Sequence, residues 1–248
     1  MLVLALDTSS LALSCALCDV DAASGRSATL ATSLHLPPEK HGDLLPGALL
    51  ALLAQSGKSL EDVSALVVGL GPGSFTGLRV GLASAKAIAY ARKLPLLGAS
   101  SLRGLARGVA GKGRLVVPTL EARKAELYAE VLEDERTLCA AAAYRAPALV
   151  AKLRELSGEG LPLLVGPGAA ACRAELNGAG APAEWWGSGE LLGFPSAAAL
   201  VELIVGGYLN LRYDQSKVFA LQPDYVKPSE AEVALSEGRV GGLGGGSS

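Results

Sequence analysis

The sequence predicts an α/β protein made of two successive halves, each built on its own mixed β-sheet. Three strand-like segments open the chain, and helices then alternate with strands, an order that indicates parallel strands added to the sheet. A looser version of this order begins again near residue 114. At 248 residues, 50% of them hydrophobic, the chain is long enough for one large domain or two small ones.

The first three strands are predicted from short apolar segments separated by turn residues. Leu2 to Asp7 is an apolar run typical of a buried strand, and the turn tripeptide TSS follows it. The segments ALSCALCD and ATLATSLHL, the latter from Ala28 to Leu36, have the composition of two further strands with a turn near Gly25.

Helices and strands alternate through the rest of the first half. The segment that follows His41 carries leucines at helical spacing, contains Pro46 in its early turns, and ends at Gly57. A strand at Val63–Val68 and a helix at Thr76–Lys93 are expected next, followed by a strand at Pro95–Ser100 and a helix at Ser101–Val109.

The second half repeats this order less regularly. Arg114 to Leu132 again has the pattern of strand, turn and strand, and Glu121 stands 114 positions after Asp7. The later elements begin with an amphipathic run at Leu149–Leu156 and a strand at Leu161–Val165. A Gly-Pro-Gly turn at Gly166–Gly168 leads into a helix from Ala169, and a last helix spans Ser196–Gly206. The predicted boundaries are 1–110 for the first half, 111–228 for a degenerate second half and 229–248 for a flexible tail.

The order βββαβαβα resembles the ribonuclease-H-like fold of the actin, hexokinase and Hsp70 superfamily (ASKHA). Members of that superfamily contain two such halves in tandem, which agrees with the internal repeat. The resemblance implies a cleft in which an acidic residue at the first turn of each half holds Mg²⁺ through water.

The residues of this chain at those two turns are the candidates for such a nucleotide site: Asp7, Thr8, Ser9, Ser10 and Glu121. The turn after Asp7 contains no glycine that would let backbone amides approach a phosphate. Asp7 could equally cap its own turn, and Glu121 could belong to an exposed ion pair with Arg123.

The segment GLGPGSFTGLRVGLASAKAIAYA, residues 69–91, matches neither common nucleotide loop. A P-loop needs a Lys directly after its second Gly, and the dinucleotide fingerprint needs a third Gly where Thr76 stands. Two interpretations remain: an anion site at a helix N-terminus, or a tight turn from strand to helix, which we favour.

The helix of this segment carries a stripe of small residues. Gly77, Gly81, Ala85 and Ala89 recur at every fourth position and therefore share one face. Because Gly costs a helix about 1 kcal/mol relative to Ala, two glycines indicate a packing reason. The close neighbour could be the protein's own sheet or another chain.

Composition excludes several classes of function. A formal net charge of −2, a pI of about 5.8 and 4% aromatic residues leave no basic field for nucleic acid and little for base stacking. Cys15 and Cys18 lie within a predicted strand and point to opposite faces, which favours core thiols over a redox pair. No segment has the features of a signal peptide or of a membrane span, so we expect a cytoplasmic protein.

Catalytic and metal-binding patterns are scarce. The two histidines, His35 and His41, are six positions apart, which is a poor spacing for one helix face, and no cysteine cluster has zinc spacing. No Gly-x-Ser-x-Gly nucleophile elbow is present. The residues therefore give little support to catalysis by this chain alone.

Several motifs occur in the order seen in the TsaB (YeaZ) family, and the chain resembles that family from Leu2 to about Lys227. The motifs are LALDTSS, HGDLLP, GLGPGSFTGLRVGLASAKAIA, LLGASSL, EARKAELYAEV and PDYVK. The stretch from Gly71 to Ala87 is the most specific part. Glu121 and Ala125 depart from the family pattern, which has Asp and Gly there.

The resemblance implies an accessory subunit of the machinery that makes threonylcarbamoyladenosine in tRNA. Such subunits are not enzymes on their own; they pair with the catalytic paralogue TsaD, and the ATPase TsaE joins the pair. The implied interface lies on helices of the first half: His41, Leu44, Leu45, Gly77, Gly81, Ala85 and Ala89. No cofactor is firmly implied, although ATP or ADP with Mg²⁺ could bind at the complex interface.

Two hypotheses from different classes follow. The first is a non-catalytic scaffold that completes a tRNA-modifying transferase, meets tRNA only through the complex and forms a homodimer when alone. The second is an autonomous ATP-dependent phosphotransferase or ATPase of the actin-like fold. The second requires a nucleotide cleft with Asp7 and Glu121 accessible and ionised.

Overall fold

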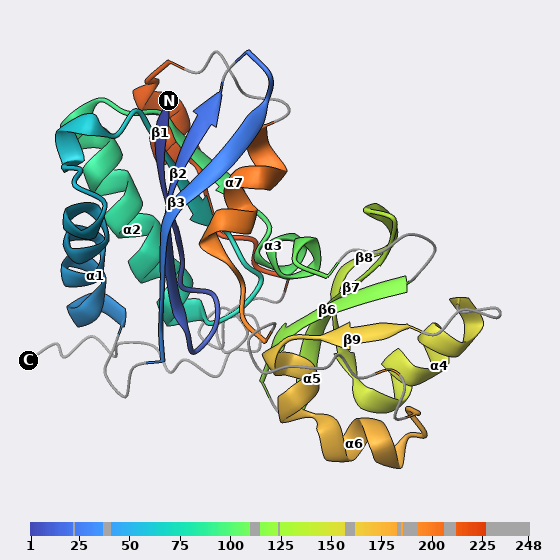
Figure 1. Ribbon diagram of the computed structural model, residues 1–248. Coiled ribbons are helices and arrows are strands. Elements are labelled where there is room, and N and C mark those ends of the chain that lie inside the picture. Colours follow the sequence, from blue (N-terminus) through green and yellow to red (C-terminus); the bar gives the residue numbers. More distant parts are fainter. Residues whose placement is uncertain are drawn as a thin grey trace, which may run out of the picture.

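The chain folds into two lobes, each built on its own mixed β-sheet (Figure 1). The computed structural model describes residues 1–21, 23–36, 41–109, 115–123, 125–156, 162–182, 185, 193–205 and 212–226. The predicted α/β architecture of two tandem halves is confirmed. The tail at 229–248 lies outside the described residues.

The first sheet has the strand order β3-β2-β1-β4-β5. Strands β1 to β3 are antiparallel neighbours, and β4 and β5 are added parallel to β1, as the alternation of strands and helices predicted. The bounds are β1 Leu2–Asp7, β2 Leu13–Asp21, β3 Arg26–His35, β4 Ala65–Gly69 and β5 Leu96–Ala99.

Helices cover both faces of the first sheet (Figure 1). Leu4 and Leu6 of β1 pack in a core with α1 and α2, whereas Val3 and Ala5 pack in a core with α7. Burial on both faces explains why β1 and β4 read as continuous apolar runs. The bounds are α1 His41–Gln55, η1 Leu60–Asp62, α2 Phe75–Arg92, α3 Ser101–Arg107, α7 Ala197–Val205 and α8 Gln215–Ala220.

The second lobe repeats the first with one strand fewer among the described residues. Its sheet order β8-β7-β6-β9 corresponds to β3-β2-β1-β4, with β9 parallel to β6. The bounds are β6 Leu115–Glu121, β7 Glu126–Glu133, β8 Arg136–Arg145, α4 Ala146–Leu156, β9 Leu163–Val165, α5 Pro167–Ala171 and α6 Arg173–Gly178.

A Gly-Pro-Gly turn follows the corresponding strand in each lobe and strengthens the repeat. A Cβ on Gly73 would lie 2.1 Å from the carbonyl oxygen of Ser9, just after β1. A Cβ on Gly168 would lie 2.5 Å from the carbonyl oxygen of Leu120 in β6. Both turns therefore press against the end of the lobe's first strand, where no side chain fits.

The predicted boundary of the second half requires a correction. Residues 111–228 were expected to form it, yet α7 and α8 pack on the first lobe. Leu200 and Val201 of α7 lie in the core with Val3 and Ala5, and Val218 of α8 joins the core under α1 and α2. α7 is buried against the first sheet and α8 packs on α2 and β5, so contacts that are remote in sequence decide the boundary.

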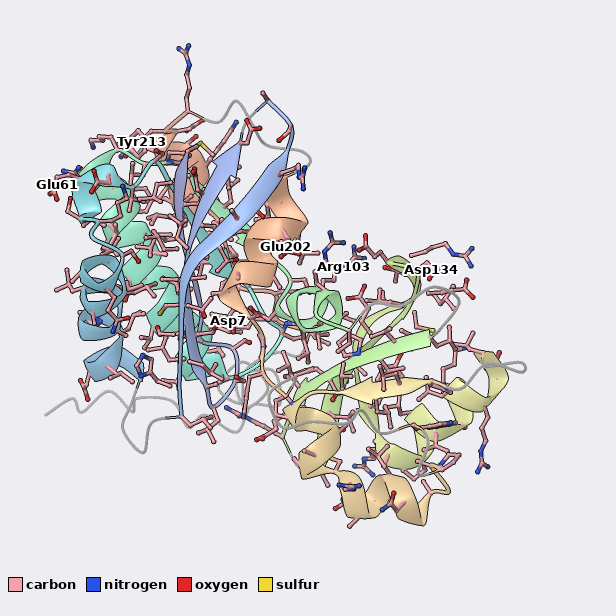
Figure 2. The ribbon with its side chains drawn as sticks, viewed as in Figure 1. Asp7, Glu61, Arg103, Asp134, Glu202 and Tyr213 are labelled. Atoms are coloured by element: carbon pink, nitrogen blue, oxygen red, sulfur yellow. The ribbon has the colours of Figure 1, made fainter. Side chains whose placement is uncertain are left out.

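The lobes meet along α3. Leu105 of α3 packs against Val116 and Val165 of the second sheet. Arg103 donates from Nε and Nη2 to Glu130 Oε1 at 3.1 and 3.0 Å, and only 4% of Glu130 is exposed. Figure 2 shows Arg103 at this junction. One helix thus joins the two sheets through apolar packing and a part-buried ion pair.

The two cysteines of β2 are separate core thiols, as predicted. Cys15 packs in the core below α1 and α2, Cys18 packs in the core below α7, and both are free. Burial raises the pKa of Cys15 to about 12. A thiol that stays protonated at neutral pH is a poor nucleophile, so this pair is not a redox site.

Ala125, which departs from the family pattern, has a left-handed backbone with φ of 56°. A Cβ in this region costs about 1–2 kcal/mol, and glycine carries no such penalty. We expect Ala125→Gly to raise the free energy of unfolding by about 1 kcal/mol, measured by urea unfolding. Ala129→Gly, in the interior of β7, is the control and should lower it.

Candidate functional site

Asp7, the residue expected to hold Mg²⁺, is buried in the first lobe (Figure 2), with 1% of its surface exposed. Its Oδ1 accepts hydrogen bonds from the backbone N–H of Ser9 at 2.8 Å and from Ser9 Oγ at 2.6 Å. Its Oδ2 accepts from Ser101 Oγ at 2.6 Å. The carboxylate therefore caps its own turn and also ties β1 to the start of α3.

Ser101 also connects this carboxylate to the glycine loop. Its Oγ accepts from the N–H of Gly71 at 3.1 Å, and its own N–H donates to the carbonyl oxygen of Gly71 at 2.9 Å. Ser101 was not among the site residues expected from the sequence. The signal that could have identified it is its place just after β5, because the carboxyl ends of parallel strands share one edge of a sheet.

The glycine loop is pressed against the turn that follows β1. Ser74 N–H donates to the Ser9 carbonyl oxygen at 2.7 Å, and Ser74 Oγ caps α2 by accepting from Gly77 N–H at 3.2 Å. On the strand side, a Cβ on Gly69 would lie 1.9 Å from Asp7 Oδ2. These contacts support the interpretation of a tight strand-to-helix turn.

Thr8 explains the small residues of α2. Its hydroxyl donates to the Gly77 carbonyl oxygen at 2.7 Å, and its side chain is fully buried. A Cβ on Gly81 would lie 2.2 Å from Thr8 Oγ1 and 3.2 Å from Leu6 Cδ1. The neighbour that requires close approach is therefore β1 of the same chain.

The expected partner interface is corrected for five of its seven residues. Those five face the inside of the first lobe and are buried: Leu45, Gly77, Gly81, Ala85 and Ala89. Leu44 is partly buried against the same core. The side chain of His41, the first residue of α1, lies outside what the structure describes. The small-residue stripe fits the chain's own sheet and presents no surface to another protein.

The opposite faces of α1 and α2 are exposed and largely apolar. Leu50 is 63% exposed and Tyr90 45% exposed. The two helices also expose small residues: Gly47, Ala51, Ala54, Ala83 and Ala87. We name the face formed by these seven residues the α1/α2 face. Leu50 was not among the interface residues expected from the sequence, although it is out of phase with the buried Leu45, Leu49 and Leu52.

The candidate nucleotide residues offer few ligand atoms to solvent. Asp7, Thr8 and Ser9 are at most 2% exposed and bond within the chain, whereas Glu121 is exposed at the end of β6. Among the described residues, no group of three or more His, Cys, Asp or Glu side chains could hold a metal ion. The helices within the described ranges are too short or too polar to cross a bilayer. In this arrangement the Asp7 carboxylate is hydrogen-bonded within its own lobe.

Asp7→Asn is expected to lower the free energy of unfolding by about 1–3 kcal/mol, because the new amide hydrogens face buried groups that now donate to a carboxylate. Thermal and urea unfolding of the purified chain measure this change. Glu121→Gln provides the matched control at the other candidate acid and should change stability by less than about 0.5 kcal/mol. Equal effects of the two substitutions would contradict a structural role for Asp7.

These features define a two-lobed protein of the ribonuclease-H-like class. The turn after its first strand is held by hydrogen bonds from the chain's own side chains. A family model described as TsaD, tRNA N6-adenosine threonylcarbamoyltransferase, matches residues 36–177, which is more than half of the chain. The chain belongs to this family, within the group of its TsaB (YeaZ) members.

Relatives named for tRNA threonylcarbamoyladenosine biosynthesis support this assignment. TsaB of Escherichia coli is 36% identical over 138 residues, which cover 54% of this chain and 57% of that protein. TsaB of Bacillus subtilis is 32% identical over 128 residues, which cover 52% and 53% of the two proteins. The chain thus spans little more than half the length of the curated relatives it matches.

A solved structure supports the fold across both lobes. A Pseudomonas aeruginosa protein described as similar to the peptidase YeaZ superimposes with a TM-score of 0.71 at 23% identity. The superposition covers 91% of this chain and 99% of that protein. At this identity the likeness concerns architecture alone.

Proposed function

We propose that the chain is a non-catalytic scaffold subunit that pairs with a TsaD-like transferase. The pair would form N6-threonylcarbamoyladenosine at position 37 of tRNAs that read ANN codons. The observation that carries the proposal is that the Asp7 carboxylate is hydrogen-bonded within the chain, in a protein whose relatives are named for this modification. An acid that is bonded to Ser9 and Ser101 supports the architecture and does not hold a metal-nucleotide.

The α1/α2 face supplies the surface for the transferase in this proposal. Leu50 is the most exposed large apolar residue of α1, and the small residues Gly47 and Ala54 lie one helical turn away on either side of it, so a partner helix could approach closely. Its seven defining residues are uncharged, and the exposed Asp43 and Arg79 lie one helical turn before Gly47 and Ala83, at its edge. A helical, apolar face of the partner would match it.

The remaining components enter through the complex. A TsaE-like ATPase joins the pair, ATP or ADP with Mg²⁺ binds at the complex interface, and tRNA is held by the assembly in the cytoplasm. The net charge of −2 supports an indirect contact with tRNA, because counterion release from phosphates requires a basic surface.

The test is reconstitution with the TsaD-like protein from the same organism. We expect a complex of defined mass, tRNA modification only when both proteins are present, and no ATP hydrolysis by this chain alone. Hydrolysis at enzyme-like rates by the isolated chain, lost in Asp7→Asn and Glu121→Gln, would overturn the proposal in favour of an autonomous enzyme.

A further inference from the structure

The hairpin of β7 and β8 closes with a turn that its sequence does not favour. Glu133 pairs with Arg136, so Asp134 and Glu135 form a two-residue loop, and both have a left-handed backbone, with φ of 46° and 70°. Turns of this kind usually carry Asn-Gly or Asp-Gly, because glycine adopts such angles without a steric penalty. Asp134 fits that preference and Glu135 does not. The disfavoured backbone of Glu135 indicates that contacts outside the turn hold it in place.

The side chain of Glu135 contacts Arg107, the last residue of α3. Arg107 Nη1 donates to Glu135 Oε1, and Arg107 Nε donates to Glu202 Oε2 of α7 at 3.3 Å. One guanidinium thus binds the hairpin of the second lobe and a helix of the first. The side chains of Arg107, Glu135 and Glu202 are 35%, 58% and 46% exposed, so dissolved salt reaches these ion pairs and screens them.

The ion pair of Arg103, one helical turn earlier on α3, is better shielded. Its acceptor Glu130 is 4% exposed and also accepts a hydrogen bond from Thr137 Oγ1 at 2.9 Å. The apolar packing of Leu105 against Val165 joins the lobes as well and involves no charge. We therefore expect salt to act on the turn and to leave the two lobes together.

The turn forms one wall of a cavity of about 200 Å³ between the lobes, and the two arginines of α3 also line it. Figure 2 labels Arg103, Asp134 and Glu202 in this part of the molecule. The apolar lining comes from α3, β6, β7 and α7: Ala106, Val116, Leu132 and Leu203. The first three of these are at most 5% exposed. A movement of the turn would therefore uncover apolar surface without unfolding either sheet.

We propose that the turn at Asp134 and Glu135 is a salt-sensitive lid, held over this cavity by Arg107. At low ionic strength the two carboxylates bound to Arg107 keep Glu135 in its left-handed conformation. At high ionic strength these ion pairs weaken, and the backbone preference of Glu135 favours release of the turn. The open lid gives small uncharged molecules access to the apolar lining while the lobes stay joined.

The rate of thiol labelling measures the opening of the lid. Ala106→Cys places a small thiol in the cavity lining of the full chain, and its reaction with iodoacetamide, a small neutral reagent, is followed by mass spectrometry of the peptide that contains it. We expect the rate to rise about threefold between about 20 mM and about 1 M NaCl, because screening weakens the ion pairs. Ala148→Cys, on the exposed side of α4, corrects for the effect of salt on an open thiol.

Substitutions of the charged residues, each combined with the cavity thiol, test the cause of the opening. In Arg107→Gln and in Glu135→Gln, labelling at low salt should be about fivefold faster and no longer depend on salt, with circular dichroism verifying the fold. Arg136→Gln is the matched control, because Arg136 pairs at 2.5 Å with Glu133 inside the same hairpin, and it should keep the salt response. A labelling rate that salt leaves unchanged, or equal rates in Arg107→Gln and Arg136→Gln, would overturn the proposal.

Discussion

Gly81→Leu is expected to destabilise the folded chain by about 3 kcal/mol, a typical upper value for inserting atoms into a packed core. The first added carbon would lie 2.2 Å from Thr8 Oγ1, so α2 must move away from β1. That movement also strains the hydrogen bond from Thr8 to the Gly77 carbonyl oxygen. Urea unfolding monitored by circular dichroism measures the loss.

The control for Gly81→Leu is Ala83→Leu, two positions further along α2. Ala83 is exposed, so the same side chain there should change stability by less than about 0.5 kcal/mol. If both variants are as stable as the unsubstituted chain, the close packing of α2 on β1 does not exist in solution. The sequence alone left open whether Gly81 approaches the chain's own sheet or another chain.

Leu50→Arg should weaken binding to the TsaD-like protein by about 30-fold or more, as expected for a central apolar contact worth about 2 kcal/mol. Leu50 is 63% exposed, so an arginine is tolerated in the monomer but introduces an unpaired charge into an apolar interface. Isothermal titration with the purified partner measures the affinity, and circular dichroism verifies that the variant is folded.

A matched pair of substitutions tests whether position decides this effect. Ala54→Arg places the charge on the exposed side of α1, and Ala151→Arg places it on the exposed side of α4 in the second lobe. Only the first should reduce affinity. Unchanged affinity in both Leu50→Arg and Ala54→Arg would place the interface elsewhere.

Local patterns were enough to predict most of the fold. Apolar runs such as Leu2–Asp7 and turn residues marked the strands, and the predicted helix at Thr76–Lys93 is observed at Phe75–Arg92. In helices and strands the buried residues recur with a fixed period along the chain, so the sequence contains this information directly. The internal repeat was also detectable, because each lobe needs the same order of strands to complete its sheet.

The candidate site was located by sequence but its role was not. Asp7 was identified as special, yet its partner Ser101 is 94 positions away along the chain. Hydrogen bonds between such distant residues leave no local pattern. Whether a buried acid binds a ligand or supports a turn therefore depends on which donors the fold brings to it.

The sequence by itself determined the two-lobed α/β architecture, the close approach at Gly81 and the family to which the chain belongs. Tertiary structure alone decided what approaches Gly81, since a stripe of small residues records only that a neighbour is near. It also decided that α7 returns to the first sheet and that Leu50 remains outside. Each of these outcomes depends on apolar surface that is buried between segments distant in sequence. The periodic spacing of apolar residues indicates which face of a segment is buried, but not which distant segment covers it.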